Sequence, residues 1–274
     1  MSDFQFPPDI LDFKHPSFES LHHYARALSA IRRELTPRQK HWAHASLRVN
    51  ATGLTTTPIP YKSALFEIVL DLIAHRAMVT TSRGERWETR LRGQSLSQFW
   101  KELNDALDAL QIFPNAPKPD FVDAPSTYEE RAVENYWRAL SQMDILLKQF
   151  QSGLRGETSP VQFWPHNFDL AMLWFSGRLV PGQDPQDEEN ADEQMNFGFS
   201  PGDKGISEPY FYITAYPLPA AFVGSELPTG AYWQSDGWRG AVLLYKTVAA
   251  SDEPDALLLD FWLTVQKRGA QLMS

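Results

Sequence analysis

The stretch Pro160–Arg178 reads PVQFWPHNFDLAMLWFSGR, with two tryptophans, three phenylalanines and one histidine among its nineteen residues. Beyond Phe168 the apolar residues follow one another without the alternation of a half-exposed strand. Such a run is typical of a strand that is buried on both faces in the centre of a sheet. We therefore expect most of the aromatic side chains to lie in a hydrophobic core, and the polar residues Asp169 and Arg178 become candidates for function.

A fainter copy of this stretch lies in the first half of the chain. The Trp-x-His spacing of Trp164 and His166 recurs at Trp42 and His44, and a glycine follows each pair. Further matches occur in the same order: YARALS (24–29) with YWRALS (136–141), and the Phe-Trp pairs at 99–100 and 261–262. Because the matches are colinear, we predict an internal duplication. Two such units would pack as a pseudo-twofold pair, with a pocket near their shared seam.

The spacing of apolar residues predicts the elements of each half. Intervals of three and four predict helices over residues 18–35, 95–110, 128–150 and 254–269. Alternation predicts strands over residues 44–52, 65–75, 76–82, 85–92, 210–216 and 241–248, with residues beyond Phe168 as a further strand. We therefore predict an α+β protein of two related units, each an antiparallel β-sheet flanked by helices.

Proline and charge clusters mark the boundaries between these parts. Residues 113–127 hold four prolines and show little periodicity. We predict a first unit over residues 1–112, a linker over 113–127 and a second unit over 128–274. Within the second unit, the acidic segment at about 181–208 contains glycine and proline, which predicts a long and partly mobile loop.

Composition excludes several classes of protein. The 274 residues include no cysteine, which excludes disulfides, iron–sulfur clusters, thiolate zinc sites and cysteine nucleophiles. The net charge of −9 provides no basic surface, so we predict no nucleic-acid partner. Neither a signal peptide nor a membrane-spanning run is apparent. We therefore expect a soluble, cytoplasmic protein without a membrane partner. The sequence indicates nothing about its oligomeric state.

The histidines and carboxylates do not form a metal-binding pattern. His41 and His44 are three residues apart, as are His166 and Asp169, but residues three apart on a strand point to opposite faces. The chain also has no HExxH, GxSxG, GxGxxG or P-loop motif. We predict no metal and no cofactor. The sequence does not exclude an enzyme that uses neither a metal nor a cofactor.

His166, beside Trp164 in the aromatic stretch, is a candidate acid/base residue because apolar surroundings shift the pKa of an imidazole. It could equally be a core histidine that is hydrogen-bonded to the backbone or to Asp169. A row of tyrosines on one face of the strand over 210–216 could hold an aromatic or sugar-like ligand, or could pair across the sheet; its members are Tyr210, Tyr212 and Tyr216.

Arg48 belongs to a second polar strand face. Ser46 and Asn50 share that face with it if residues 44–52 form a strand. Such a face could line a polar cleft, or it could simply contact water, as the exposed side of an antiparallel sheet does.

Several segments resemble one known family. In the first half they are HWAHASLRVNATGLTTTPIPY (41–61), FEI (66–68) and His75; in the second they are SPV (159–161), FDLA (168–171), FSGR (175–178) and Tyr216-Pro217. With these segments the chain resembles the bacterial domain-of-unknown-function family 5996 over nearly its whole length. The resemblance implies a bacterial-type soluble protein and no particular activity. It directs attention to His44, Asp169 and Arg178, which lie inside the matched segments.

These observations favour the binding of a small organic ligand in a cleft near the seam of the two units. His44, Asp169 and His166 are the predicted acid/base residues, and Arg178 would hold an anionic group of the ligand. Further predicted ligand contacts are Arg48, Trp164, Tyr210, Tyr212 and Tyr216. Whether the protein is an enzyme is left open. The alternative is a non-catalytic interaction module, in which the tryptophans are core residues and the acidic loop meets a protein partner.

Overall fold

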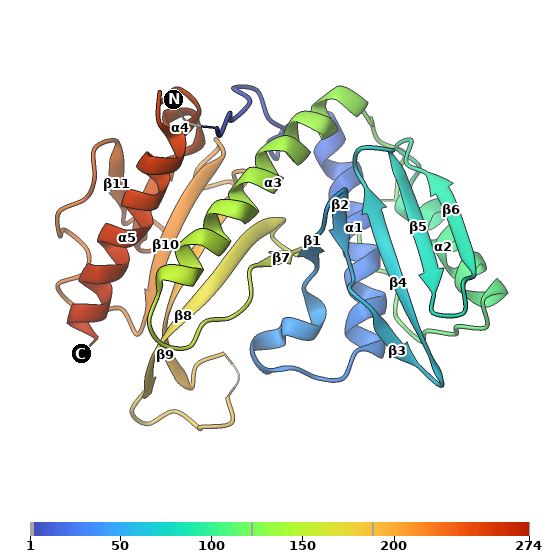
Figure 1. The fold of residues 1–274 in the computed structure, drawn as a ribbon, viewed down its shortest axis with the longest axis horizontal. Helices are drawn as coiled ribbons and strands as arrows, with labels where there is room; N and C mark the ends of the chain where they lie inside the picture. The colour runs from blue at the N-terminus through green and yellow to red at the C-terminus, as the bar shows by residue number, and fades with distance from the viewer. Residues whose placement is uncertain (1–2, 122, 188, 274) are drawn as a thin grey trace. The chain divides into compact units, whose positions relative to one another are not determined.

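Two units, each built around an antiparallel sheet, make up the chain (Figure 1). The structure is a computed structural model and describes residues 3–121, 123–187 and 189–273. Unit 1 consists of Met1–Pro8, Arg138–Val161 and Asp169–Ser274, and unit 2 consists of Asp9–Trp137 and Gln162–Phe168. The combination of helices with antiparallel sheets is the predicted α+β class.

The division between the units differs from the predicted one. Residues 113–127, which we expected to separate the halves, lie inside unit 2. Helix α3 (Glu130–Gly153) begins in unit 2 and ends in unit 1, and the short segment Gln162–Phe168 belongs again to unit 2. Each unit therefore contains residues from both halves of the chain. The internal duplication and the pseudo-twofold arrangement stay predictions.

Unit 2 contains two complete helices and seven short strands. Its elements are α1 (Pro16–Leu35), the 3-10 helix η1 (Lys40–Ala45), β1 (Arg48–Val49), β2 (Gly53–Thr55), β3 (Ile59–Tyr61), β4 (Ala64–Asp71), β5 (Arg76–Thr81), β6 (Arg86–Arg90), α2 (Leu96–Ala109) and β7 (Gln162–Trp164). The sheet has the order β1-β2-β4-β5-β6, and β3 pairs with β4. Backbone hydrogen bonds between Leu47 and Phe163 join β7 to the strand region of β1.

Local signals explain where the helices of unit 2 begin. The His15 side chain accepts a hydrogen bond from the backbone N–H of Ser17 and caps α1, which has Pro16 as its first residue. The Ser95 side chain accepts from the backbone N–H of Gln98 and caps α2, as its capping-box spacing predicts. Both helices cover one face of the sheet (Figure 1). The buried side chains of β4 face them; they are Phe66, Ile68 and Leu70.

The predicted strand over residues 44–52 is much shorter than expected. His41 and Trp42 adopt left-handed backbone conformations, with φ of 53° and 57°, and residues 40–45 form η1. The Asn50 side chain then accepts hydrogen bonds from the backbone N–H groups of Thr52 and Gly53, which turns the chain. Only Arg48–Val49 is left as strand β1 because side-chain hydrogen bonds replace the sheet ladder after it.

Unit 1 consists of a twisted sheet and the helices on one side of it. Its strands are β8 (Asp169–Leu179), β9 (Asp192–Ser200), β10 (Tyr210–Tyr216), β11 (Ala231–Gln234) and β12 (Gly240–Leu244), in the order β11-β12-β10-β9-β8. Helices α4 (Tyr245–Ala249) and α5 (Pro254–Leu272) follow β12. The strand that we expected over 241–248 therefore ends at Leu244.

The apolar face of this sheet packs against α5 and the C-terminal part of α3 (Figure 1). The ring of Phe150 on α3 lies 4.8 Å from that of Phe197 on β9 and 5.6 Å from that of Trp262 on α5. Trp262 also contacts Phe211 on β10, at 6.1 Å between ring centroids. Aromatic pairs at these separations add to the free energy of burial, so this layer is the core of unit 1.

Strand β9 corrects the interpretation of residues 181–208 as one long loop. The segment from Gln194 to Ser200 reads QMNFGFS and alternates polar or small residues with apolar ones, which is the pattern of a strand with one buried face. The many acids before it obscure this signal. The acidic part itself contains hydrogen-bonded turns, such as the one in which Asp187 accepts from the backbone N–H groups of Glu189 and Asn190.

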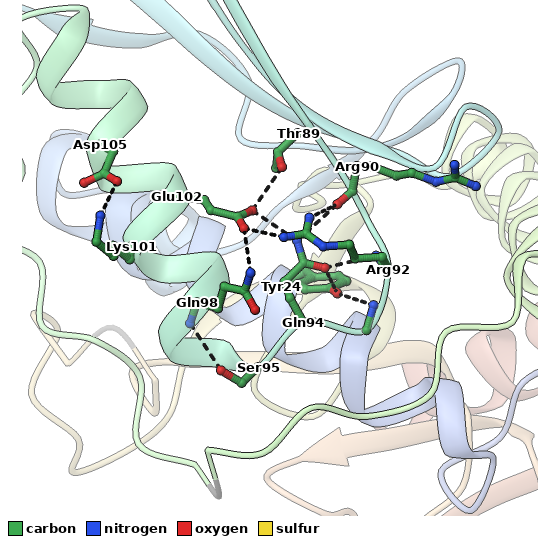
Figure 2. A network of polar contacts seen from close by, with 11 residues as sticks. Tyr24, Thr89, Arg90, Arg92, Gln94, Ser95, Gln98, Lys101, Glu102 and Asp105 are labelled. Atoms are coloured by element: carbon green, nitrogen blue, oxygen red, sulfur yellow. Dashed lines mark hydrogen bonds and ion pairs between the residues drawn. The ribbon is translucent and has the colours of Figure 1, made fainter.

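A polar network joins α1, β6 and α2 in unit 2 (Figure 2). The Glu102 carboxylate accepts hydrogen bonds of 2.5–3.3 Å from the side chains of Thr89, Arg92, Gln94 and Gln98. The buried Tyr24 hydroxyl donates to Gln94 Oε1 at 2.6 Å and accepts from the backbone N–H of Gly93 at 3.0 Å. Because these polar groups satisfy one another, the network stabilises the fold and leaves little capacity for a ligand.

The substitution Tyr24→Phe tests the contribution of this network to stability. It removes the acceptor of the Gly93 N–H and one donor to Gln94, so we expect the free energy of unfolding to fall by about 1–3 kcal/mol. Chemical denaturation measures the change. The matched control is Tyr232→Phe at a side chain that is 38 % exposed, which should change the value by less than about 0.5 kcal/mol. Equal effects of the two substitutions would contradict the role of the network.

Candidate functional site

The second face of the unit 1 sheet carries the polar residues of three neighbouring strands. In the register, Tyr212 on β10 is opposite Gly198 on β9, and Gly198 is opposite Ala171 on β8. Asp169 shares this face with Ala171 because side chains two apart on a strand point the same way. We call this side the polar face; its central residues are Asp169, Ala171, Asn196, Gly198 and Tyr212. Gln194 lies on the same face further along β9, opposite Tyr216.

Asp169 and Tyr212 form a hydrogen bond that spans β9. The Tyr212 hydroxyl donates to Asp169 Oδ2 at 2.5 Å. Asp169 is only 7 % exposed, and burial raises the pKa of its carboxyl to about 6, although the hydrogen bond from Tyr212 acts in the opposite direction. Burial and the neighbouring carboxylate raise the pKa of Tyr212 well above its usual value, so the phenol remains the donor. A carboxyl group with this pKa can exchange a proton near neutral pH.

Gly198 makes this hydrogen bond sterically possible. A Cβ atom at residue 198 would lie 2.5 Å from both Cζ and Oη of Tyr212, closer than van der Waals contact allows. The tyrosine ring therefore lies directly over the backbone of β9, in the space that any other side chain would fill.

Three oxygens on the polar face are buried without a hydrogen-bond partner among the described residues. They are Asp169 Oδ1, Asn196 Oδ1 and Gln194 Oε1. The other end of the Gln194 amide donates to the carbonyl of Glu189, which establishes Oε1 as the end without a partner. Buried polar atoms normally have partners, and orphaned acceptors indicate water or a ligand that donates hydrogen bonds.

Aromatic side chains border the polar face on its β10–β12 side. The Tyr210 ring stacks on that of Trp238 with centroids 6.2 Å apart, and Trp238 meets the Tyr212 ring edge to face at 6.4 Å. Ile206, Tyr210 and Val242 form a small hydrophobic cluster, and Tyr212 and Trp238 pack against it. The Tyr210 hydroxyl donates to Asp203 Oδ2 at 2.6 Å. Tyr210 and Tyr212, the first two members of the predicted tyrosine row, thus form an apolar wall with Trp238. The hydroxyl of Tyr212 also donates the hydrogen bond to Asp169.

Arg178 and Tyr216 lie away from this centre. Arg178 is nine residues after Asp169 on the same strand, roughly 30 Å at about 3.3 Å per residue. Its guanidinium binds the Glu193 carboxylate with contacts of 2.9–3.2 Å. The Tyr216 hydroxyl accepts a hydrogen bond of 3.4 Å from Gln183. Arg178 is therefore far from the Asp169 carboxyl along the strand, and its guanidinium is paired with Glu193.

Four predicted site residues belong to unit 2. His44 is buried in η1, stacks on Trp42 with centroids 5.5 Å apart and accepts a hydrogen bond from the backbone N–H of Gln39 at its Nδ1. The Arg48 guanidinium donates to the Ser46 hydroxyl at 2.8 Å. These contacts tie both side chains to neighbouring residues in the sequence.

Trp164 and His166 contact each other at the end of β7. Their rings meet edge to face, with centroids 5.9 Å apart. His166 is exposed at the surface; desolvation and the charge of Arg26 lower its pKa. A hydrogen bond from this histidine to the backbone or to Asp169 stays a prediction.

The deeper histidine of this region is His22 on α1. Its ring packs against those of Phe18, Phe121 and Phe168 with centroids 5.3–5.5 Å apart. Burial and the positive charge of Arg26 lower the pKa of His22 to about 4, although the backbone carbonyls of residues 165 and 166 act in the opposite direction. His22 is therefore neutral at physiological pH, and its ring packs among aromatic side chains.

Neither the pairing of Asp169 with Tyr212 nor the role of Gly198 is apparent from the sequence alone. One signal was present. The alternation of Gln194, Asn196 and Gly198 with apolar residues places them on one strand face, as the tyrosine row is placed on the next strand. Which of these residues are opposite one another across the sheet can be seen only in the structure.

The comparison with family models gives one match, to the family of unknown function DUF5996, over residues 8–274. No curated protein matches the chain, and no solved structure does. Among residues 3–121, 123–187 and 189–273, no helix combines the length and the apolar composition of a membrane span. Within the same ranges, no three histidine or carboxylate side chains are grouped so that they could hold a metal ion.

Gly198→Ala should displace the Tyr212 ring and break its hydrogen bond to Asp169. We expect a loss of about 1–3 kcal/mol in the free energy of unfolding because the buried carboxylate loses its donor. In the background Tyr212→Ala, where the ring is absent, the same change should cost less than about 0.5 kcal/mol. A double-mutant cycle, measured by chemical denaturation, compares the cost of Gly198→Ala with and without the Tyr212 ring. An equal cost in both backgrounds would show that Gly198 acts independently of Tyr212.

The lowered pKa of His22 predicts a loss of stability in acid. The pKa of His22 is 6.5 in the unfolded chain and about 4 in the folded protein. Between these two pH values the unfolded chain therefore binds more protons than the folded protein. Its contribution is therefore complete above about pH 6.5 and is lost as the pH falls toward 4, by at most about 3 kcal/mol. The difference in unfolding free energy between the wild type and His22→Phe should shift by that amount over this range. A difference that does not change with pH would contradict burial of His22.

Proposed function

The chain belongs to the DUF5996 family of unknown function, and we propose that it binds a small polar molecule at the polar face of unit 1. The observation that carries this proposal is the group of buried acceptor oxygens without partners, chiefly Asp169 Oδ1. A ligand with N–H or O–H groups would supply the missing donors. Each such hydrogen bond to a charged acceptor contributes about 1.5–3 kcal/mol.

The surroundings of Asp169 suit a ligand with both polar and apolar parts. Asn196 lies two residues from Gly198 on the same strand face and presents an amide group there, and its side chain is only partly buried. The aromatic wall of Tyr210, Tyr212 and Trp238 provides a flat apolar surface. Ring faces of this kind pack against the carbon skeleton of a ligand while hydrogen bonds orient it.

Asp169 also has the properties of an acid/base catalyst. Tyr212 holds Oδ2, while Oδ1 is left to accept a proton from an N–H or O–H group of the ligand. A pKa of about 6 lets the same carboxyl return the proton near neutral pH. Proton abstraction from a bound ligand, followed by return of the proton to another of its atoms, is the reaction that this pair supports.

Two further predicted residues take no part in this proposal. Arg178 has its charge compensated by Glu193, far along β8 from the carboxyl group. His44 is a buried residue of unit 2 and stacks on Trp42, whereas Asp169 belongs to unit 1. A cleft near the seam of the two units stays a prediction from the sequence.

A thermal-shift screen with metabolites tests the binding proposal. Amines, amides and polyols are expected to raise the melting temperature, since a ligand at about one hundred times its dissociation constant stabilises by about 2.7 kcal/mol. Asp169→Asn should weaken binding of the best ligand at least tenfold, and Tyr212→Phe should weaken it less. The matched control is Asp236→Asn, which removes an exposed carboxylate of unit 1 and should leave the affinity unchanged.

Two results would contradict the proposal. The first is a broad panel of donor-rich compounds that produces no shift, which favours the interaction module. The second is a ligand whose affinity is the same in the wild type and in Asp169→Asn.

A further inference from the structure

A pocket in unit 2 lies where two hairpin turns meet the end of α2. The turn between β3 and β4 contributes Tyr61 and Lys62, and the turn between β5 and β6 contributes Arg83 and Glu85. Leu110 and Ile112 close the pocket from the end of the helix. None of these residues belongs to the polar face of unit 1.

The backbone holds Lys62 at the rim of this pocket. Tyr61 and Ala64 are paired across the hairpin, so Lys62 is the first of the two residues in the turn, where it adopts a left-handed φ of 51°. Its ammonium group lies 5.2 Å from the centroid of the Tyr61 ring and 5.7 Å from that of Phe113. The backbone N–H of Phe113 donates to the Tyr61 hydroxyl at 3.1 Å, which ties the two aromatic residues together.

The pocket has an excess of positive charge. Within the part of the chain that the structure describes, neither Lys62 nor Arg83 forms an ion pair with a carboxylate. The one carboxylate in the lining, Glu85, accepts a hydrogen bond from the Thr81 hydroxyl at 2.8 Å. Two cations against one anion leave a net charge of +1, which attracts an anionic group.

The end of α2 does not neutralise these cations. Its final carbonyl groups accept backbone hydrogen bonds from Leu110, Gln111 and Ile112, with lengths of 2.8–3.1 Å. Gln111 takes the left-handed conformation, with φ of 60°, that closes this type of helix end. The carbonyls of Ala106, Leu107 and Asp108 are thus occupied within the backbone, and they do not bind Lys62 or Arg83.

Apolar side chains surround the charged groups. Leu65 lines the pocket and is 46 % exposed, while Phe113 beside Lys62 is 49 % exposed. A contiguous apolar surface beside polar groups is typical of ligand-binding grooves. Tyr61, Leu110 and Ile112 extend the apolar lining. The ligand that fits such a lining has an apolar body as well as its charge.

We propose that this pocket is a second binding site and that it takes a small organic carboxylate with an apolar body. The carboxylate would lie between the Lys62 ammonium and the Arg83 guanidinium, and the body would lie against Leu65 and the end of α2. Arginine suits this role because its planar donors match a carboxylate. This site is independent of the one proposed around Asp169.

Isothermal titration with 1-naphthoate, octanoate and the neutral analogue 1-naphthamide tests the proposal. At least one of the two carboxylates should bind the full chain, and the neutral amide should bind at least tenfold more weakly than 1-naphthoate. The variant Lys62→Asn/Arg83→Gln should lose at least tenfold in carboxylate affinity. Asparagine tolerates the left-handed conformation, so the hairpin turn is kept. Whichever carboxylate binds more tightly shows whether the body is aromatic or aliphatic.

Matched variants keep the test specific. Lys204→Ala/Arg239→Ala removes two exposed cations of unit 1, and Asp169→Asn removes the carboxyl of the other proposed site. Both should bind the carboxylate like the wild type. Arg83→Gln alone should retain the wild-type unfolding midpoint and still weaken binding severalfold. The proposal is overturned if neither carboxylate binds at millimolar concentration, if the amide binds equally well, or if the control variants weaken binding as much as Lys62→Asn/Arg83→Gln.

Discussion

In unit 1, the hydroxyl of Tyr212 reaches across a neighbouring strand to the buried carboxylate of Asp169. This contact requires a strand with no side chain at the crossing point, which is Gly198, and it requires the three strands to keep one register. A slip by one residue would turn every side chain of the moved strand to the opposite face. The hydrogen bond, the glycine and the register are therefore parts of one constraint, and the polar face of the sheet depends on it.

The two faces of this sheet differ in how their side chains are satisfied. One face is aromatic, packs against α3 and α5, and forms the core around Phe197 and Trp262. The other face keeps acceptor oxygens away from water without giving them partners. The network around Glu102 in unit 2 shows the contrast, because several donors satisfy its carboxylate (Figure 2). Buried polar groups that are fully paired stabilise a fold, whereas unpaired ones indicate a binding partner.

Much of the fold could be predicted from local signals. The Ser95 cap, the alternation in 65–71 and the tyrosine row in 210–216 each gave the correct kind of element, because such patterns depend on neighbours in the sequence. The left-handed pair at His41 and Trp42 could not be predicted, since residues other than glycine rarely adopt it. The acids that precede β9 obscured a strand whose alternation is regular. The site was predictable only as separate residues, because cross-strand register depends on long-range contacts.

The stretch around Phe168 illustrates both outcomes. Its aromatic residues are core, as predicted, and the Phe168 ring meets those of Phe18, Tyr136 and Phe163 at 4.9–5.6 Å. The next residue, Asp169, is the polar exception on which the proposed function depends. The most direct test of that account is a carbon-13 NMR titration of the Asp169 side-chain carboxyl. A pKa near 6 is expected. A pKa of about 4 or lower, as in a solvated carboxylate, would contradict the buried pair and the function proposed for it.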